Sequence, residues 1–291
     1  MCFRVVPVEL HFTTVTPSTW KAFKKKSPII FIHGLLDSGN SWNRVKNKIC
    51  QDTGRKGYII TLRNHGRSTW SEEITTEHFI ADLENFMADQ NISRAVMVAH
   101  SIGAKPAMQL ALRKPEMVEK LVVEEMRIHK DDNQKPEIEE FIKKLKLTEE
   151  YVEKFPSSMS EAEAHNKLQK LTSFMIFKEV PGEDSKPKPM AFTLPIYKDI
   201  DGTFKWDVNL KPIIRNLETI EVFDYELEEK QIYLGETLFI SAEYSKLQVI
   251  DEKEVILKHF PNAEVFTAKG VFHCYHTEKA TEFMEKNNIF Y

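Results

Sequence analysis

The chain has 291 residues, 42% hydrophobic and 29% charged, the composition of a globular protein with a substantial core. Its net charge of −4 gives no electrostatic reason to expect nucleic acid or an anionic membrane as a partner. Three cysteines without a CxxC pair argue against a disulfide framework, and no run of residues has the length and purity of a transmembrane helix. The N-terminus shows neither a secretory nor a mitochondrial leader, so we expect a cytoplasmic protein without an integral membrane segment.

Short apolar runs bounded by breakers recur along the chain and predict strands that are covered on both faces. A first, half-buried strand is expected within Val5–Val15, where apolar and polar residues nearly alternate. The buried strands are expected at Pro28–Ile32, Gly57–Leu62, Ala95–Ala99, Leu121–Val123, Thr237–Ile240 and Ala263–Phe266. Helices are expected between them at Ser41–Ile49, Thr76–Asp89, Ala104–Arg113, Asp251–His259 and Glu278–Lys286. This alternation predicts an α/β protein with a mostly parallel central sheet flanked by helices.

The alternation stops between residues 126 and 233. This region contains the charged amphipathic stretches IEEFIKKLKL and NKLQKLTSFMIF, followed by a Pro/Lys-rich link, PGEDSKPKP. We expect a helical cap (lid) inserted between two sheet strands, over the carboxyl edge of the sheet. The predicted division is a core domain of residues 1–125 and 234–291 and a cap of residues 126–233.

One serine stands in a short turn, in VMVAHSIGAKPAM, between an expected strand and an expected helix. The local pattern Ala99-x-Ser101-x-Gly103 is a relative of the G-x-S-x-G nucleophile elbow, in which a strained turn exposes the hydroxyl above the sheet. Ligands and chemistry collect at the carboxyl ends of parallel strands, and Ser101 stands at one. The alternative is a serine that only caps the following helix.

A serine needs a base before it becomes a good nucleophile. Where a nucleophile elbow is followed along the chain by the acid and then the histidine, the histidine stands in the loop after the last strand. His273, in KGVFHCYHTEK, stands after the last expected strand. His276 is the competitor, and a structural role for both histidines stays open. The H-C-x-H grouping could also belong to a metal site, but no second cluster with ligand spacing supports one, so we predict no metal.

A third element is the turn in FIHGLLDSGNSW, which follows an expected strand directly. An HG turn there can aim a backbone N–H at a developing oxyanion, with a second N–H from the residue after the nucleophile. The two donors would be Leu35 and Ile102. The alternative is that Gly34 only makes the turn.

Together these stretches resemble the α/β-hydrolase superfamily and, within it, a group of small serine esterases. The matching segments are PIIFIHGLLDSGNSWNRV, RNHGRS, VMVAHSIGAKPAMQLALRKPEMVEKLVV and HCYHTEK, and they cover most of the sheet domain but little of the cap. The resemblance implies Ser101 as nucleophile, His273 as base and Glu125, at the position of the family's usual aspartate, as acid. Neighbouring side chains in a strand point to opposite faces, so only one of Glu124 and Glu125 can meet His273. Glu243, after a later strand, is a further alternative for the acid.

The resemblance implies a serine hydrolase that cleaves small to medium acyl esters without any cofactor. It would be a carboxylesterase, or alternatively a thioesterase or a lipase-like enzyme. Its partner would be a small-molecule acyl ester. Three cap residues, Phe174, Phe177 and Phe192, would line an acyl pocket, although such apolar stripes are also typical of helix packing. Relatives also imply mitochondrial residence as an alternative compartment. The alternative function is a weakly active or non-hydrolytic small-molecule-binding protein on the same scaffold, because fold alone does not determine function.

Overall fold

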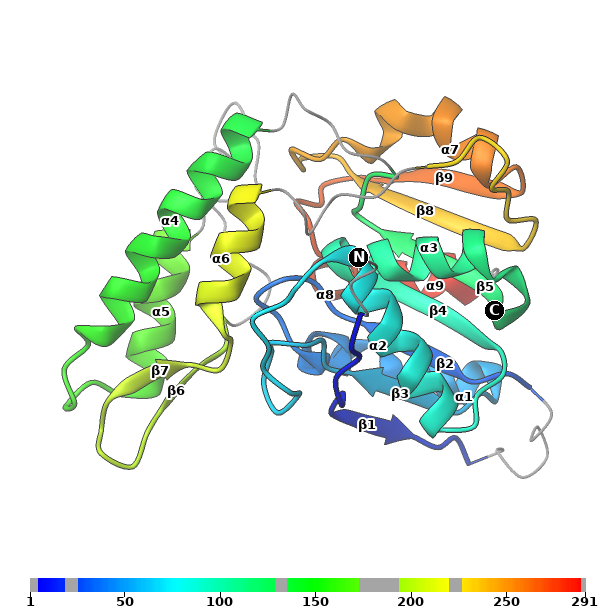
Figure 1. Cartoon of the computed structure of the whole chain (residues 1–291). Coiled ribbons are helices and arrows are strands. Elements are labelled where there is room, and N and C mark those ends of the chain that lie inside the picture. The colour runs from blue at the N-terminus through cyan, green and yellow to red at the C-terminus, as the bar shows by residue number, and fades with distance from the viewer. Residues whose placement is uncertain (1–4, 19–25, 129–134, 173–193, 220–226, 289–291) are drawn as a thin grey trace.

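The protein is built around a seven-stranded sheet in the order β1-β3-β2-β4-β5-β8-β9 (Figure 1). This computed structural model describes residues 5–18, 26–128, 135–172, 194–219 and 227–288. β1 pairs antiparallel with β3, and the other strands of the sheet pair in parallel, which confirms the predicted mostly parallel α/β sheet. The strands are β1 (Phe12–Val15), β2 (Ile29–Ile32), β3 (Gly57–Ile60), β4 (Ala95–His100), β5 (Val118–Glu124), β8 (Glu236–Ala242) and β9 (Ala263–Ala268).

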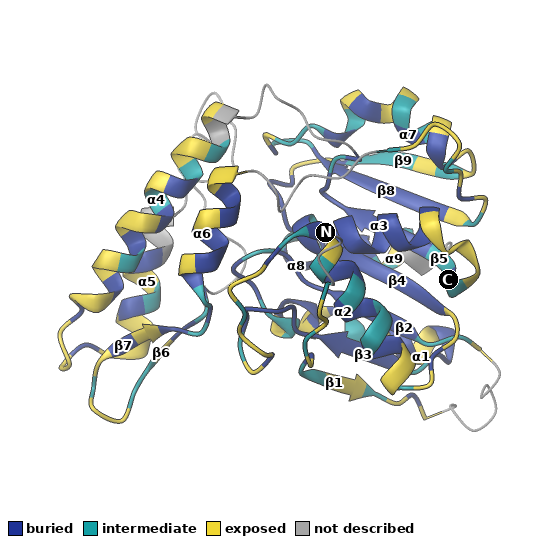
Figure 2. Ribbon diagram, in the orientation of Figure 1, coloured by how far each residue is buried: buried dark blue, intermediate teal, exposed yellow. Residues whose placement is uncertain are grey.

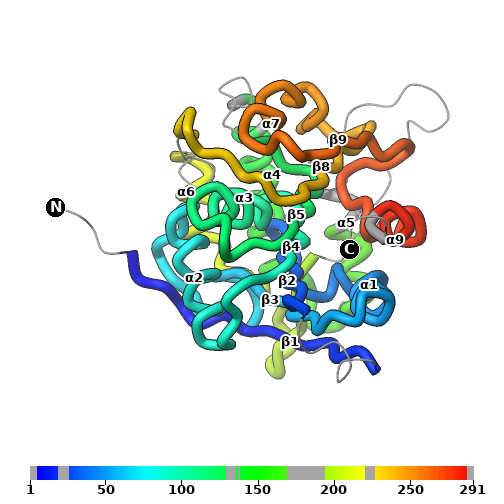
Figure 3. Tube along the Cα trace, turned by 90° about the vertical axis from the view of Figure 1, so that its right-hand side faces the viewer, coloured from blue at the N-terminus to red at the C-terminus, as the bar shows by residue number. Residues whose placement is uncertain are grey.

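Helices cover both faces of this sheet (Figure 3). Alternate residues of β2 show the division: Ile30 and Ile32 pack in one apolar cluster, Ile29 and Phe31 in the other. The first cluster contains residues of α2, α3 and α7, and the second contains residues of α1, α8 and α9. These helices are α1 (Lys46–Thr53), α2 (Thr76–Asp89), α3 (Ala104–Arg113), α7 (Lys253–His259), α8 (Tyr275–Glu278) and α9 (Ala280–Asn288).

The central strands are buried along their whole length, as their uninterrupted apolar runs predict. Every residue of β2, β3 and β4 is buried, and these strands are uniformly dark in Figure 2. Burial on both faces leaves the carboxyl ends of the strands as the place where polar side chains can gather, and the functional residues must be sought there.

Between β5 and β8 the chain leaves the sheet and forms a separate layer, which we call the insert (Figure 1). It contains helices over the two amphipathic stretches, and also a hairpin, β6–β7, and a third helix, α6, that the sequence analysis did not identify. The hairpin turn is closed by a hydrogen bond from the Asp199 N–H to the Thr203 carbonyl at 2.8 Å, with Gly202 at φ 83°. The stretch PGEDSKPKP lies outside the described residues. The elements of the insert are α4 (Lys135–Glu153), α5 (Glu161–Thr172), β6 (Ile196–Lys198), β7 (Phe204–Trp206) and α6 (Leu210–Thr219).

The insert is fastened to the core at the turn that contains the RNHG sequence, just after β3. The Gly66 N–H donates to the Asp207 carbonyl at 2.7 Å, and the Asn209 N–H donates to the Asn64 carbonyl at 2.9 Å. Asn64 and Asn209 are also joined through their side chains at 3.2 Å. Because β3 ends immediately before this turn, the insert meets the core at the carboxyl edge of the sheet.

Several element boundaries differ from those expected. β1 is shorter than Val5–Val15, because the chain before it bonds to loops and to the Asp82 side chain, which accepts the Val8 N–H at 2.7 Å. The expected helix Ser41–Ile49 divides at Val45 into a 3₁₀ segment, η1 (Gly39–Arg44), and α1. Similar short 3₁₀ segments are η2 (Ser101–Gly103), η3 (Pro115–Met117) and η6 (Val249–Glu252), the last of which replaces the first turn of the expected helix Asp251–His259.

The expected helix Glu278–Lys286 is also wrong at its start. α8 ends at Glu278 and α9 begins at Ala280, with Lys279 between them outside the helical region at φ −136° and ψ 58°. Within the described ranges, no helix is both long and apolar enough to cross a bilayer.

Candidate active site

Ser101 lies at a sharp turn between β4 and α3, in the left-handed region at φ 51°. A non-glycine residue there is strained, as in a nucleophile elbow. The turn packs closely on the strand beside it, since a Cβ added to Gly103 would lie 2.3 Å from the His33 carbonyl oxygen. Ala99, where glycine is usual, is fully buried in β4, so its methyl group is accommodated.

The loop after β2 reaches the same turn. A Cβ added to Gly34 would lie 3.0 Å from the Ser101 Cβ and 2.8 Å from the His100 Nδ1, so only glycine allows this approach. The N–H groups of Leu35 and Ile102, predicted as oxyanion donors, find no acceptor in the described part of the chain.

Two buried histidines, which sequence reasoning did not assign a role, hold this loop. The Nε2 of His33 accepts the Leu62 N–H at 3.0 Å, and the Nε2 of His65 accepts the Leu36 N–H at 3.2 Å. An accepting nitrogen carries no proton, so both rings are neutral and their Nδ1–H groups donate to carbonyls. Burial lowers the pKa of His33 to about 3 and that of His65 to about 4, so the loop keeps its shape at neutral pH.

Of the three candidate acids, Glu125 is the one that meets His273. Its Oε2 lies 3.2 Å from the His273 Nδ1, and its Oε1 accepts the Ala242 N–H at 2.5 Å. Glu125 is fully buried at the end of β5, with φ 55°. The carboxylate is thus fixed by the backbone of β8, and it fixes the orientation of the imidazole.

The other two acids have other partners. Both oxygens of Glu124 contact the Nδ1 of His276, at 2.9 and 2.8 Å, and Glu124 Oε1 accepts the His276 N–H at 3.1 Å. Glu124 and Glu125 therefore point to opposite sides of β5. Glu243 binds the Lys269 ammonium at 2.9 Å and accepts the Gly270 N–H at 2.8 Å, away from both histidines.

A further carboxylate that sequence reasoning missed holds the loop that carries His273. Glu278 accepts three successive backbone N–H groups, from Phe272 at 2.9 Å, His273 at 3.0 Å and Cys274 at 2.8 Å. Hydrogen bonds to a charged acceptor are the stronger kind. Its position at the end of α8 gave no signal, because a glutamate there looks like a solvated helix residue.

His100, which directly precedes Ser101, links the elbow to the His273 loop. Its Nε2–H donates to the His273 carbonyl at 3.1 Å, and the two rings are 4.7 Å apart. Burial lowers the pKa of His100 well below its usual value, so it is a neutral positioning group. No hydrogen bond joins the Ser101 hydroxyl to His273 among the described residues; in ligand-free sites such bonds are often long.

Two predictions concern other positions. The predicted acyl-pocket residues Phe174, Phe177 and Phe192 lie outside the described residues. In the described ranges no group of three or more His, Cys, Asp or Glu side chains is arranged to hold a metal, and the Cys274 thiol in the H-C-x-H grouping lies 3.8 Å from the His100 Nε2.

Comparison with known proteins agrees with this geometry. Residues 27–280 match the family described as alpha/beta hydrolase fold. The chain is 29% identical over 257 residues to the sn-1-specific diacylglycerol lipase ABHD11 of Mus musculus, covering 88% of this chain and 78% of the relative. It is 29% identical over 258 residues to a putative esterase/lipase of Haemophilus influenzae, covering 86% and 78%.

Among solved structures, a marine microorganism esterase is similar at a TM-score of 0.75 and 25% identity, covering 98% of this chain and 100% of that one. The resemblance seen in the sequence is thereby confirmed. Because the family match extends from before β2 into α9, the chain belongs to the α/β-hydrolase fold family.

Proposed function

We propose that this chain is a serine hydrolase that cleaves carboxylic ester bonds through an acyl-enzyme intermediate. The observation that carries the proposal is the strained elbow at Ser101 on the same sheet edge as the buried Glu125–His273 pair. A serine hydroxyl becomes a useful nucleophile only when an oriented base takes its proton. The relatives include proteins named esterase and lipase, which agrees with hydrolysis of esters.

In the acylation step, the Ser101 oxygen bonds to the carbonyl carbon of the ester while the His273 Nε2 takes the hydroxyl proton. The carbonyl π electrons move onto oxygen and form a tetrahedral oxyanion. As the intermediate collapses, the bond to the leaving oxygen breaks, and His273 returns its proton to the departing alcohol. Glu125 keeps the Nδ1 proton of His273 facing it and stabilises the imidazolium.

Deacylation repeats these steps with water. His273 takes a proton from water as its oxygen bonds to the acyl carbon, and then protonates the Ser101 oxygen as it departs, which releases the carboxylic acid. A thioester would follow the same path with a thiol as leaving group. The steps require no cofactor or metal.

The oxyanion is stabilised in both steps by the N–H groups of Leu35 and Ile102. The close approach of the loop after β2 to Ser101 depends on Gly34, and the loop is held by His33 and His65. Removing one such donor costs roughly 3–4 kcal/mol of transition-state stabilisation in enzymes of this type.

We further propose that residues 126–233 form a cap on a core of residues 1–125 and 234–291. In support, the insert lies on the side to which the parallel strands point in Figure 1, and it bonds to the core at Gly66 and Asn64. Small to medium acyl chains remain the predicted substrates, with Phe174, Phe177 and Phe192 as predicted pocket residues.

The test is labelling with a fluorophosphonate, together with turnover of p-nitrophenyl butyrate and octanoate. We expect the native chain to be labelled and Ser101→Ala to lose both labelling and turnover. Ser158→Ala, which alters an exposed serine of the insert, is the matched control and should behave as the native chain. A folded native chain that is not labelled and turns over neither ester would contradict the proposal and favour a ligand-binding protein on this scaffold.

A further inference from the structure

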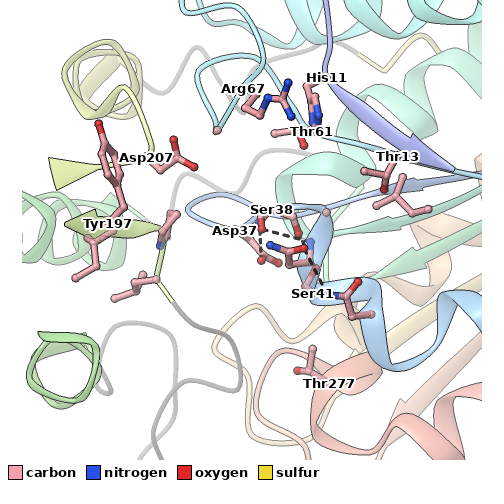
Figure 4. Close-up of a pocket in the computed structure, with 18 of the residues that line it drawn as sticks. His11, Thr13, Asp37, Ser38, Ser41, Thr61, Arg67, Tyr197, Asp207 and Thr277 are labelled. Atoms are coloured by element: carbon pink, nitrogen blue, oxygen red, sulfur yellow. Dashed lines mark hydrogen bonds between the residues drawn. The ribbon is translucent and has the colours of Figure 1, made fainter. Parts of the chain in front are cut away.

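A cavity of about 690 Å³ lies between the insert and the part of the core that carries β1 and β3 (Figure 4). This volume is within the ~300–1,000 Å³ of typical small-molecule sites. The loop after β2 supplies Asp37 on the core side, and Asp207, directly after β7, lies on the insert side. Figure 4 shows the two sides facing each other across open space. The proposed nucleophile, base and acid do not line this cavity, so we consider it as a site of its own.

Asp37 carries the clearest sign of a ligand on the core wall. It is 4% exposed, and its Oδ1 accepts the Ser38 N–H at 2.7 Å. Its Oδ2 is buried without a hydrogen-bond partner among the described residues. In Figure 4 the side chain lies at the edge of the open space. A buried carboxylate oxygen without a donor is unfavourable, and a donor group on a ligand would satisfy it.

The insert wall presents a second carboxylate, that of Asp207. The Asp207 carbonyl accepts the Gly66 N–H at 2.7 Å, and its N–H donates to the Pro195 carbonyl at 2.7 Å. These two bonds fix the backbone of the residue, and Figure 4 shows its carboxylate turned toward the open space. Within the described ranges this carboxylate forms no ion pair. Each wall therefore offers one carboxylate that no cation of the protein neutralises by contact.

The positive side chains of the lining have other surroundings. The Arg44 guanidinium donates to the Thr277 carbonyl at 2.5 Å. Arg67 lies beside His11 in Figure 4, and the pKa of His11 is lowered by burial and by this nearby charge. Burial raises the pKa of both cavity aspartates, that of Asp37 to about 6. The two arginines thus do not offset the cost of burying the two carboxylates.

The lining also contains apolar side chains from both walls. Ile59 of β3 stands on the core side, and Leu194, Pro195 and Ile196 stand on the insert side. These side chains suit the methylene groups of a ligand, whereas the carboxylates suit charged donors, whose hydrogen bonds are stronger than neutral ones. An uncharged polyol would bring no counter-charge to the carboxylates, and an anion would be repelled by them. An aliphatic chain with an ammonium group at each end matches both features.

We propose that this cavity binds an organic diamine, with one ammonium group against Asp37 and the other against Asp207. The site goes beyond the proposed ester hydrolysis and does not depend on it. Because the two carboxylates lie on opposite walls, the bound diamine links the insert to the core and stabilises their contact.

The test measures binding to the full chain by isothermal titration calorimetry, with linear diamines from 1,4-diaminobutane to 1,8-diaminooctane. For the length that binds best, the amino alcohol and the diol of the same chain replace one or both ammonium groups by hydroxyls. We expect each replacement to weaken binding about tenfold, the effect of losing one charged hydrogen bond. At a concentration about 100 times its Kd, the diamine should raise Tm by about 5 °C.

Variants of the two carboxylates locate the site. Asp37→Asn and Asp207→Asn keep the size of the side chain but lose its charge, so each should weaken diamine binding about tenfold and change diol binding much less. Asp201→Asn, which alters an exposed aspartate in the β6–β7 turn, changes the net charge by the same amount and should bind as the native chain does. Circular dichroism checks that all three variants are folded.

Several results would overturn the inference. They are absence of diamine binding, equal affinities for the diamine and the diol, and diamine binding that only one or neither of Asp37→Asn and Asp207→Asn weakens. Tighter binding of the diol would assign the cavity to an uncharged polyol, and binding of inorganic phosphate that Arg67→Ala abolishes would assign it to an anion. Labelling of Ser101 by the fluorophosphonate is measured separately, so failure of the proposed function is distinguishable from failure of this site.

Discussion

Two carboxylate–histidine pairs lie side by side at the end of β5, and they differ in their hydrogen-bond geometry and surroundings. Glu125 meets His273 through one contact of 3.2 Å, whereas Glu124 meets His276 through contacts of 2.8 and 2.9 Å and also accepts its backbone N–H. The His276 ring stacks on Trp42 at 4.1 Å and is fully buried. The Glu124–His276 pair is thus tighter and more deeply buried than the pair that contains the predicted base, His273.

Under the proposed mechanism, the pair with the shorter contacts and the deeper burial is not the reacting one. A catalytic imidazole needs one nitrogen held by a carboxylate and the other free to meet the nucleophile. The Nε2 of His276 is buried without a partner among the described residues, against Trp42 and Phe283. We infer that Glu124 and His276 anchor α8 and so position the loop that carries His273.

The largest expected effect is a difference in kcat between variants of Glu125 and Glu124. We predict that Glu125→Gln lowers kcat by about 10³–10⁴, because the amide cannot hold the reactive tautomer or stabilise the imidazolium. Glu124→Gln should lower kcat by less than about tenfold, since it acts only through the position of α8. The measurement is kcat on p-nitrophenyl butyrate with folding checked by circular dichroism. Losses of similar size would show that the two pairs do not have separate roles.

For the free energy of unfolding we expect the opposite order: substitution of His276 should cost more than substitution of His273. His276→Ala removes a ring that stacks on Trp42 and leaves the buried Glu124 carboxylate with only the backbone N–H of residue 276, so we expect the free energy of unfolding to fall by about 3–5 kcal/mol. His273→Ala should cost about 1 kcal/mol, because Glu125 still accepts the Ala242 N–H. Urea unfolding of both variants measures the difference. A larger loss for His273→Ala would contradict the anchoring role of His276.

The smallest effect concerns Asp37, a third carboxyl group near the Glu124–His276 pair. Burial raises the pKa of Asp37 to about 6, although the Ser38 N–H, the His276 imidazole and the Ser41 hydroxyl oppose the shift; Glu124 adds to it. Between about pH 4 and 6 the native state keeps a proton that the unfolded chain has released, so the free energy of unfolding falls as pH rises. Asp37→Asn should lack this fall and gain about 2–3 kcal/mol relative to the native chain by pH 7. A pH-independent difference between the two proteins in urea unfolding would contradict the shift.

Periodicity and breakers were enough to predict the sheet and much of the helical layer. The bounds of α2 and α3 agree with the expected ones to the residue. Alternation along the strand also predicted that the side chains of Glu124 and Glu125 point in opposite directions, and they meet different histidines. Hairpin β6–β7 escaped prediction because strands of three residues are too short to show alternation.

The supporting groups of the candidate site were much harder to predict. Glu278 binds the backbone of the loop before it, and His33 and His65 accept backbone N–H groups of Leu62 and Leu36. Such contacts join side chains to backbone groups that have no residue-specific signature. The sequence therefore points to the residues that would react, and three-dimensional structure is needed for those that hold them.

The left-handed backbone at the elbow has a consequence for how this protein changes under selection. Ser101 and Glu125 both have positive φ, at 51° and 55°, and such a conformation costs a non-glycine residue roughly 1–2 kcal/mol. A glycine at position 101 would relieve that strain and, under the proposed mechanism, would also abolish the reaction. A laboratory search for heat-resistant variants that does not also demand turnover will therefore tend to replace Ser101, the proposed nucleophile.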